Sequence, residues 1–295
     1  MALDELKHFR KAAEKCFVSQ PTISGQIKKL EEYLGVELIE RTKQKVFLTE
    51  VGKRVIERAR IILNEVNQIE EISKTSADPM SGKINIGIIP TLAPFFLPLI
   101  ISPLKKKFPR LETVLFELQT AVIIEKLNKG ELDLGILALP FDDIFLAEEK
   151  LFDEPFFMAV SKEHRLSKKK IVNFEDLSRE TVLLLEEGHC LGQQSLEICY
   201  RAGAKEMKNF RATSMETLRN MLVVENNMVT LIPQLAVNHY KKLKEEYIKY
   251  IPFEKPHPKR TIGLIYRKSS CKKKCFTNIG ELLKEIILTS IILSF

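Results

Sequence analysis

Apolar residues recur at helical spacing through the first part of the chain, with two short breaks. One helix is predicted from Phe9 to Cys16, with Cys16 on its apolar, core-facing side. A second is predicted from Gln20 to about Leu34, with Ser19 placed to cap its start and Gly35 to end it. Its buried face is expected to consist of Ile23, Ile27, Leu30 and Leu34.

Two short extended segments follow, around residues 38–41 and 46–48, on either side of a polar turn at Thr42–Lys45. Two helices joined by a tight turn and followed by such a hairpin form a winged helix-turn-helix, which inserts its second helix into the major groove of DNA. Amides and hydroxyls read base edges there, and cationic side chains hold phosphates. The residues expected to contact double-stranded DNA are Ser19, Gln20, Pro21, Thr22, Ser24, Gln26, Lys28, Lys29, Arg41 and Lys43.

A long helix is predicted from Thr49 to about Ser76. Its apolar positions alternate at spacings of four and three, which is a heptad seam: Val55, Ala59, Ile62, Val66 and Ile69. A second copy of the chain is the expected partner, and packing onto its own domain is the alternative. Asp78 to Gly82 breaks the helix. We therefore divide the chain into a DNA-binding domain (1–50), a linker or dimerisation helix (51–78) and a C-terminal domain (79–295), which the family resemblance described below implies to be a sensor.

Beyond this break, short apolar runs alternate with helical stretches. The runs lie at residues 84–89, 134–139, 182–185, 228–232 and 261–266. Continuous apolar strands separated by helices predict a parallel sheet covered on both faces. Because the segment is long for a single sheet, we expect two α/β lobes with a cleft, lobe I at about 82–155 and 260–295 and lobe II at about 156–259.

Composition narrows the class of protein. The net charge of +7 over 295 residues suits an anionic partner, although the run Lys272–Lys274 is typical of a solvated surface. Neither a signal-peptide core nor a membrane-length apolar stretch is evident, so we expect a cytoplasmic protein without a membrane partner. Five cysteines, an odd number, favour reactive over structural thiols.

Enzymatic and metal chemistry find little support in the sequence. No glycine-rich phosphate loop and no Ser/His/Asp set with hydrolytic spacing is present. Cys271 and Cys275 form a CxxxC pair, but no matching ligands lie nearby in the sequence. We expect no metal, no cofactor and no enzymatic activity.

The N-terminal motifs closely resemble LysR-type transcriptional regulators. The matching stretches are Phe9–Ala13, Val18–Glu31, Leu34–Arg41, Leu48–Thr49 and Gly52, and the resemblance continues through the linker and both sensor lobes. It implies a homo-oligomer built as a dimer of dimers, an activator that contacts RNA polymerase, and a two-lobed sensor of the periplasmic-binding-protein type. The expected fold is α/β, with an all-α winged helix-turn-helix N-terminal domain.

One departure from the family pattern lies at the N-terminus. A further helix normally precedes the segment that begins at Phe9, whereas this chain has only Met1 to His8 there. We expect that helix to be missing and Phe9, Ala13 and Ile27 to be exposed as a result. Either the true start lies upstream, or the DNA-binding domain is impaired.

The segment Gly188-His189-Cys190-Leu191, with Cys199 nine positions after Cys190, resembles the redox segment of peroxide-sensing members of that family. If the segment is helical, nine residues separate the two cysteines by roughly 13–14 Å along the axis. A disulfide needs Cα atoms about 4.4–6.8 Å apart, so the helix must unravel for the bond to form. Gly192 weakens that helix by roughly 1 kcal/mol relative to alanine.

The resemblance implies a role for each residue. Cys190 is the thiol that reacts with hydrogen peroxide, Cys199 condenses with it to a disulfide, and a glutaredoxin- or thioredoxin-type reductant resets the switch, which controls oxidative-stress genes. The residues expected to surround the reacting oxygens are Thr91, Thr120, His189 and Arg260. Gly192 and Gln193 replace an expected Arg-Asp pair, and Asn209 replaces an expected histidine.

Two other functions remain open. The first is a LysR-type regulator that binds a small organic effector between the lobes, with Thr91 and Thr120 as polar contacts. The second is a thiol peroxidase-like protein that does not bind DNA. Thiols that do not respond to dilute peroxide would favour the first, and rapid multiple turnover without DNA affinity would favour the second.

Overall fold

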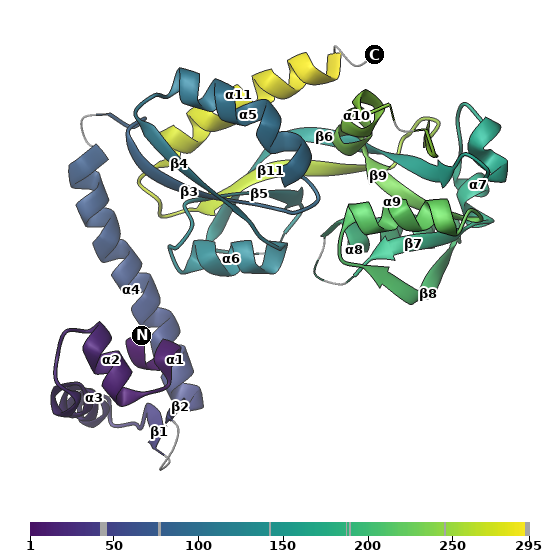
Figure 1. Ribbon diagram of the computed structural model, residues 1–295. Helices are drawn as coiled ribbons and strands as arrows, with labels where there is room; N and C mark the ends of the chain where they lie inside the picture. The colour runs from purple at the N-terminus through teal and green to yellow at the C-terminus, as the bar shows by residue number, and fades with distance from the viewer. Residues whose placement is uncertain are drawn as a thin grey trace. The chain divides into compact units, whose positions relative to one another are not determined.

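The computed structural model describes residues 1–41, 46–75, 78–141, 143–186, 188, 190–244 and 246–292 (Figure 1). The chain divides into two compact units, Met1–Ser73 and Lys74–Phe295. Among the described residues, no helix combines the length and the apolar character needed to cross a membrane.

The predicted helix pair forms the smaller unit. Helices α2 (Phe9–Lys15) and α3 (Gln20–Leu34) are joined by a tight turn. The Ser19 hydroxyl accepts a hydrogen bond from the Thr22 backbone N–H at 3.3 Å and so caps α3. At the other end, Gly35 takes a left-handed conformation with φ +67°, which ends the helix as predicted.

The expected loss of the first helix is corrected. A five-residue helix, α1 (Ala2–Leu6), precedes α2, and its Leu3 is buried against Ala12, Leu38 and Ile39. The Arg60 guanidinium donates to the Asp4 carboxylate at 2.7 Å and fastens α1 to the long helix. Ala13 is therefore buried, and Phe9 and Ile27 are half-buried rather than exposed.

Two expectations of burial are wrong in this unit. Leu30 and Leu34 are 44% and 41% exposed, because the small core around Leu3 covers only the first part of α3. Cys16 is also exposed, because α2 ends at Lys15 and leaves it at the C-cap, outside the helix. Helical periodicity marks the face that can be buried, and burial further requires a neighbouring element over that face.

The wing is present as strands β1 (Ile39–Arg41) and β2 (Val46–Leu48), which pair antiparallel. The predicted turn between them, with Lys43, lies outside the described residues. One oxygen of the Glu31 carboxylate accepts the N–H groups of Leu38 and Ile39 at 2.8 and 3.1 Å. This contact fixes the wing to α3, the second helix of the helix-turn-helix and hence the predicted recognition helix.

The long helix α4 (Glu50–Thr75) opens at Thr49 as predicted, with the Thr49 hydroxyl accepting the Gly52 N–H at 2.9 Å. A Cβ at position 52 would lie 2.1 Å from the Leu38 carbonyl oxygen, so glycine is required for this close approach. Of the heptad positions, Val55 and Ala59 are half-buried in the unit. The later ones, Ile62, Val66 and Ile69, are 63%, 48% and 68% exposed.

Nine strands form one sheet in the described part of the larger unit, in the order β4-β3-β5-β11-β6-β9-β7-β8, with β10 paired to β6. Their bounds are β3 Gly82–Ile88, β4 Leu111–Glu117, β5 Leu134–Leu139, β6 Leu146–Ser161, β7 Thr181–Leu185, β8 Lys205–Ala212, β9 Met228–Pro233, β10 Ile248–Pro252 and β11 Lys259–Arg267. The expected parallel pairing is present for β3 with β4 and β5 and for β7 with β8 and β9. The sheet is nevertheless mixed, because the pairings of β6, β10 and β11 are antiparallel. The long strand β6 pairs with β11 up to Pro155 and with β9 from Phe156, so it passes from one half of the unit to the other.

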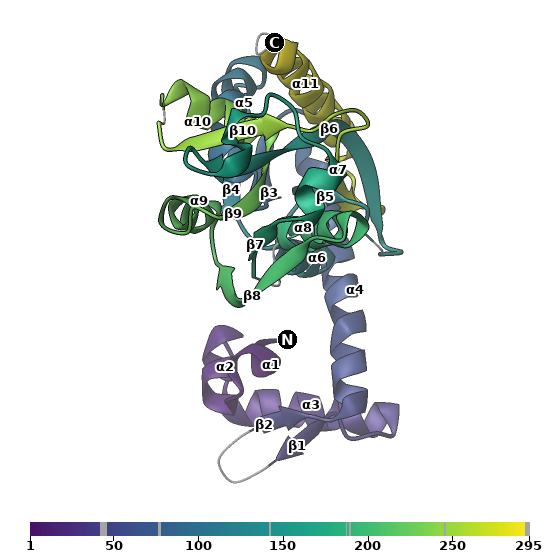
Figure 2. The same cartoon turned by 90° about the vertical axis from the view of Figure 1, so that its right-hand side faces the viewer.

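Helices cover both faces of each half, as the sequence pattern requires. In the half around β3 and β5, α5 and α11 lie on one side and α6 on the other (Figure 1). In the half around β7, Figure 2 shows α8 and α9 on opposite sides of the strands. The helix bounds are α5 Ala93–Lys107, α6 Thr120–Asn128, α7 Phe174–Ser178, α8 Cys190–Ala202, α9 Met215–Val224, α10 Gln234–Lys242 and α11 Lys273–Ile292, with a 3-10 turn at Arg165–Lys168.

Candidate functional site

The two cysteines of interest lie on one unbroken helix. Helix α8 begins at Cys190 and continues for 13 residues, so Cys199 lies in the same helix two and a half turns later. Both are free thiols; Cys190 is half-buried and Cys199 is 2% exposed. Burial raises the pKa of the Cys199 thiol to about 12. Cys199 is therefore a neutral thiol packed in the core.

Cys190 opens onto a small pocket. The pocket holds about 140 Å³ of space, adjoining solvent included, and its lining residues are Ile89, Pro90, Thr91, Gln119, Thr120, Gly188 and Cys190. Thr91 lies two residues before α5, Thr120 is the first residue of α6, and Cys190 is the first residue of α8. The starts of three helices therefore meet here, where unpaired backbone N–H groups and helix dipoles favour negative charge.

Arg260 lies behind this pocket rather than in its lining. Its guanidinium is fully buried and donates to the Thr91 hydroxyl at 3.0 Å and to the Thr91 carbonyl oxygen at 3.3 Å. Its Nε donates to the Glu154 carboxylate at 2.8 Å, and both side chains are at most 1% exposed. Arg260 thus fixes the orientation of Thr91, which in turn lines the pocket.

Two buried side-chain oxygens near the cysteine have no hydrogen-bond partner among the described residues, the Thr120 hydroxyl and the Gln194 side-chain carbonyl. A buried polar atom without a partner costs roughly 1–3 kcal/mol, so its retention suggests that a polar molecule visits the site. Gln194 was missed in the sequence, although it follows Cys190 by four residues and shares its helical face. Glu154 was missed as well, and no motif marks it, whereas Gln119 lies in a stretch that resembles the family but was assigned no role.

Two glycines allow neighbouring residues to pack closely at the start of α8. Gly188 has φ +99°, and a Cβ there would lie 3.0 Å from the Gln119 side-chain oxygen. A Cβ at Gly192 would lie 2.9 Å from the backbone oxygen of Leu185, at the end of β7. At Gly192 only glycine lets the first turn of α8 pack this closely on the strand.

The sequence-predicted redox residues are thus partly brought together. Cys190, Thr91 and Thr120 line one pocket, Arg260 contacts Thr91, and Cys199 lies further along the helix. His189 lies outside the described residues.

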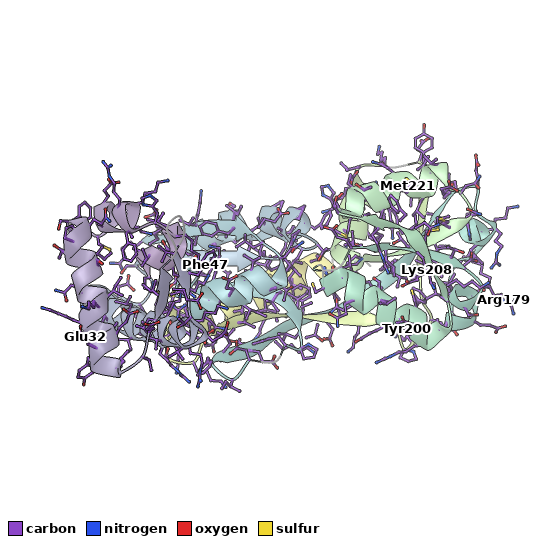
Figure 3. All side chains as sticks on the ribbon, turned by 90° about the horizontal axis from the view of Figure 1, so that it is seen from below. Glu32, Phe47, Arg179, Tyr200, Lys208 and Met221 are labelled. Atoms are coloured by element: carbon purple, nitrogen blue, oxygen red, sulfur yellow. The ribbon has the colours of Figure 1, made fainter. Side chains whose placement is uncertain are left out.

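The recognition helix presents a polar surface. Of the predicted DNA contacts on it, Ser24 is half-buried and the others are exposed, whereas the side chain of Arg41 and the whole of Lys43, in the wing, lie outside the described set. Ser19 and Thr22 pair through their hydroxyls at 2.8 Å, so both are engaged in the cap. Lys28 is exposed, and its Nζ lies 3.7 Å from a carboxylate oxygen of Glu32, which is on the outer side of α3 (Figure 3). Phe47 is exposed on the wing.

Comparison with known proteins agrees with this architecture. Residues 1–53 match the family described as bacterial regulatory helix-turn-helix protein, lysR family, and residues 77–285 match the LysR substrate binding domain. The DNA-binding transcriptional dual regulator OxyR of Escherichia coli K12 is 44% identical over 284 residues, which is 96% of this chain and 92% of that protein.

A second relative and a solved structure cover similar shares of both chains. The hydrogen peroxide-inducible genes activator of Pectobacterium carotovorum is 44% identical and covers 97% of this chain and 93% of its own. A full-length OxyR variant from Pseudomonas aeruginosa superposes with a TM-score of 0.75 at 32% identity, over 96% of this chain and 91% of its own. The chain therefore belongs to the LysR family of helix-turn-helix transcriptional regulators, among its OxyR-like members.

Proposed function

We propose that this regulator senses hydrogen peroxide through a reversible Cys190–Cys199 disulfide. The observation that carries the proposal is the placement of one half-buried thiol in a small pocket with Thr91 and Thr120, while a second thiol is buried on the same helix. The relative from Pectobacterium carotovorum, named for hydrogen peroxide-inducible genes, supports the choice of stimulus.

The size of the pocket favours peroxide over an organic effector. Pockets for organic ligands usually enclose about 300–1,000 Å³. The space beside Cys190 is about 140 Å³ even with adjoining solvent counted, which is too small for a typical organic effector. The unpartnered Thr120 hydroxyl lines the pocket, where it can accept a hydrogen bond from peroxide or donate one to it.

The chemistry balances without a cofactor. The Cys190 sulfur attacks one peroxide oxygen, the O–O bond breaks, and the products are a sulfenic acid and water. The Cys199 thiol then condenses with the sulfenic acid, which forms the S–S bond and releases a second water. Two electrons pass from the two thiols to peroxide, and a cellular dithiol of the glutaredoxin or thioredoxin type returns them.

The disulfide forces a change of structure. In α8 the two Cα atoms are about 13.5 Å apart along the axis, and a disulfide requires at most about 6.8 Å. Oxidation must therefore open α8 and repack the surrounding residues, so the helix is a two-state element. We propose that this repacking changes the positions at which the recognition helices contact promoter DNA.

The assembly is part of the proposal. The exposed seam of α4 supports pairing of two chains, and we propose a dimer of dimers that acts in the cytoplasm and contacts RNA polymerase. The base and phosphate contacts are assigned to the exposed polar face of α3 and to the wing.

Peptide mapping tests the redox step. The reduced protein receives about one equivalent of peroxide, free thiols are alkylated, and the Cys190–Cys199 peptide pair is quantified by mass spectrometry. We expect the disulfide to form within seconds in the wild type, to be lost in Cys190→Ser, and to be replaced by a trappable sulfenic acid in Cys199→Ser. Exposed Cys271 serves as the matched control, since Cys271→Ser leaves the pair intact. If Cys190 and Cys199 both remain alkylatable in unfolded samples, peroxide is not the signal.

A further inference from the structure

A buried carboxylate lies at the point where β6 passes between the two halves of the larger unit. Glu154 is the direct cross-strand partner of Arg260 in the β6–β11 register, two residues before Phe156, where β6 begins to pair with β9. One of its oxygens accepts the Arg260 Nε–H at 2.8 Å. Its other oxygen accepts the backbone N–H of Leu235, in the first turn of α10, at 2.9 Å.

We propose that Glu154 is a positioning residue for the peroxide reaction. It holds the Arg260 guanidinium so that the remaining N–H groups point at Thr91, and it ties this arrangement to the start of α10 in the other half of the unit. The inference rests on the proposed function, because it assigns Thr91 the task of orienting peroxide beside Cys190. Glu154 itself touches neither the pocket nor the cysteine in the contacts described above.

The chain of contacts is continuous and buried. It runs from the Leu235 N–H through Glu154 and Arg260 to the hydroxyl and carbonyl of Thr91, which lines the pocket with Cys190. The guanidinium is planar and cannot donate to both Glu154 and Thr91 unless its plane is fixed. Rotation of the guanidinium would break the contacts with Thr91, and Glu154 prevents it.

The role requires a carboxylate. A carboxylate accepts at both oxygens, whereas a glutamine amide offers one acceptor and places an N–H₂ group at the other position. Glu154→Gln therefore keeps the size of the side chain but sets a donor against either Arg260 Nε or the Leu235 N–H. It also leaves the buried guanidinium without its counter-charge.

The neighbouring residue provides a matched control. Asp153 precedes Glu154 on β6, and its carboxylate pairs with Lys150 and Lys259 at 2.8 and 2.7 Å. It also accepts the Thr261 hydroxyl at 2.8 Å. Asp153→Asn removes the same charge one residue away, from a group that is not part of the contacts leading to Thr91.

The experiment compares two reagents on the same thiol. In a Cys199→Ser background, the rate of Cys190 oxidation by hydrogen peroxide is followed by trapping the sulfenic acid, and the rate of alkylation by iodoacetamide is measured in parallel. Displacement of an orienting group by about 1 Å can cost on the order of a hundredfold in rate. We therefore expect Glu154→Gln to lower the peroxide rate by about tenfold or more relative to the iodoacetamide rate. Asp153→Asn should leave that ratio near the parent value.

Hydrogen exchange supplies a second readout. Exchange in the first turn of α10 should rise in Glu154→Gln and stay unchanged in Asp153→Asn. If Glu154→Gln folds poorly, Arg260→Lys tests the same arrangement. The lysine ammonium lacks the planar set of N–H donors with which the guanidinium reaches Glu154 and Thr91 at the same time. The same selective loss of peroxide reactivity is expected.

The outcomes separate the two proposals. A parent protein whose Cys190 reacts with peroxide, together with a Glu154→Gln variant that keeps the parent ratio of rates, overturns the positioning role alone. A parent whose Cys190 does not react with peroxide overturns the proposed function and the positioning role with it. An equal drop in both rates also contradicts the inference, because it indicates general damage to the fold.

Discussion

Cys190 and Cys199 lie nine positions apart on one unbroken helix, the first at a pocket and the second in the core. The helix that holds both thiols also keeps them apart. A disulfide between them is incompatible with α8, so the oxidation state of the pair selects between two packings of the same segment. Residues that stabilise α8 should therefore affect how readily the switch operates, separately from residues that act on peroxide.

Thr120 and Thr91 should respond in opposite ways to removal of their hydroxyls. The Thr120 hydroxyl is buried without a partner, so Thr120→Val should leave the stability of the reduced protein unchanged or raise it by about 1 kcal/mol. The Thr91 hydroxyl accepts from Arg260, so Thr91→Val should cost about 1–3 kcal/mol. Urea unfolding of the two variants measures the difference.

Both threonine variants should react more slowly with peroxide. The pair is informative because one variant loses reactivity without losing stability. A Thr120→Val protein that is as reactive as the wild type would show that this hydroxyl does not serve peroxide. A Thr120→Val protein that is markedly less stable would show that the hydroxyl has an unrecognised structural partner.

Burial of Cys199 predicts a loss of stability at alkaline pH. Its pKa is raised to about 12 from an ordinary 9.0, so both folded and unfolded chains keep the proton below pH 9. Between these pH values the Cys199 thiol ionises in the unfolded chain but stays protonated in the folded chain, so the free energy of unfolding falls as the pH rises. Cys199 should contribute roughly 2 kcal/mol of this loss between pH 8 and 10.5.

Urea unfolding at the two pH values measures that contribution. The stability of Cys199→Ala should decline less between the two pH values than that of the wild type. At pH 8 the variant should be less stable, because removal of the buried sulfur leaves a cavity. Cys271→Ala, which replaces an exposed thiol, should decline in parallel with the wild type. Identical slopes for all three proteins would contradict the assignment of the raised pKa to Cys199.

Local patterns in the sequence were sufficient for much of the fold. The caps at Ser19, Gly35 and Thr49 and the five apolar runs of the sensor correspond to helix ends and to β3, β5, β7, β9 and β11. Strands β4, β6, β8 and β10 were missed, because charged or half-buried positions interrupt their apolar character. Without them the antiparallel pairing of β6 and β11 was not predictable.

The candidate site was predictable only where a motif marked it. Cys190, Cys199 and the two threonines belong to recognisable stretches, whereas Glu154 and Leu235 meet Arg260 through pairings between residues distant in sequence. For Gly192 the structure adds an effect that the sequence did not predict. Its propensity argues for a weak helix, but the structure shows a glycine that permits close packing on Leu185.

Gly192→Ala sets these two effects against each other. Replacing a helix-interior glycine gains up to about 1 kcal/mol from propensity. The added Cβ would lie 2.9 Å from a backbone oxygen, a contact that must be relieved by moving the first turn of α8, and overpacking costs typically about 1–3 kcal/mol. We expect the clash to win, giving lower thermal stability and faster hydrogen exchange across residues 190–194. The exposed neighbour supplies the control, since Gln193→Ala adds propensity without a clash and should be neutral or stabilising. A more stable Gly192→Ala protein would mean that the strand end yields easily.

The exposed seam of α4 predicts how the assembly responds to charge. Ile62 and Ile69 are 63% and 68% exposed on the predicted heptad face, and a partner helix would bury both. The double substitution Ile62→Glu with Ile69→Glu places charges in that interface, where burial without partners is costly. We expect sedimentation velocity to show a particle of half the wild-type mass, with weaker DNA binding because the two recognition helices are no longer held at a fixed spacing. Ile61→Glu, on the same helix but off the seam, should retain the wild-type mass. If the double variant sediments like the wild type, the seam does not hold chains together, and packing of α4 onto its own chain becomes the better explanation.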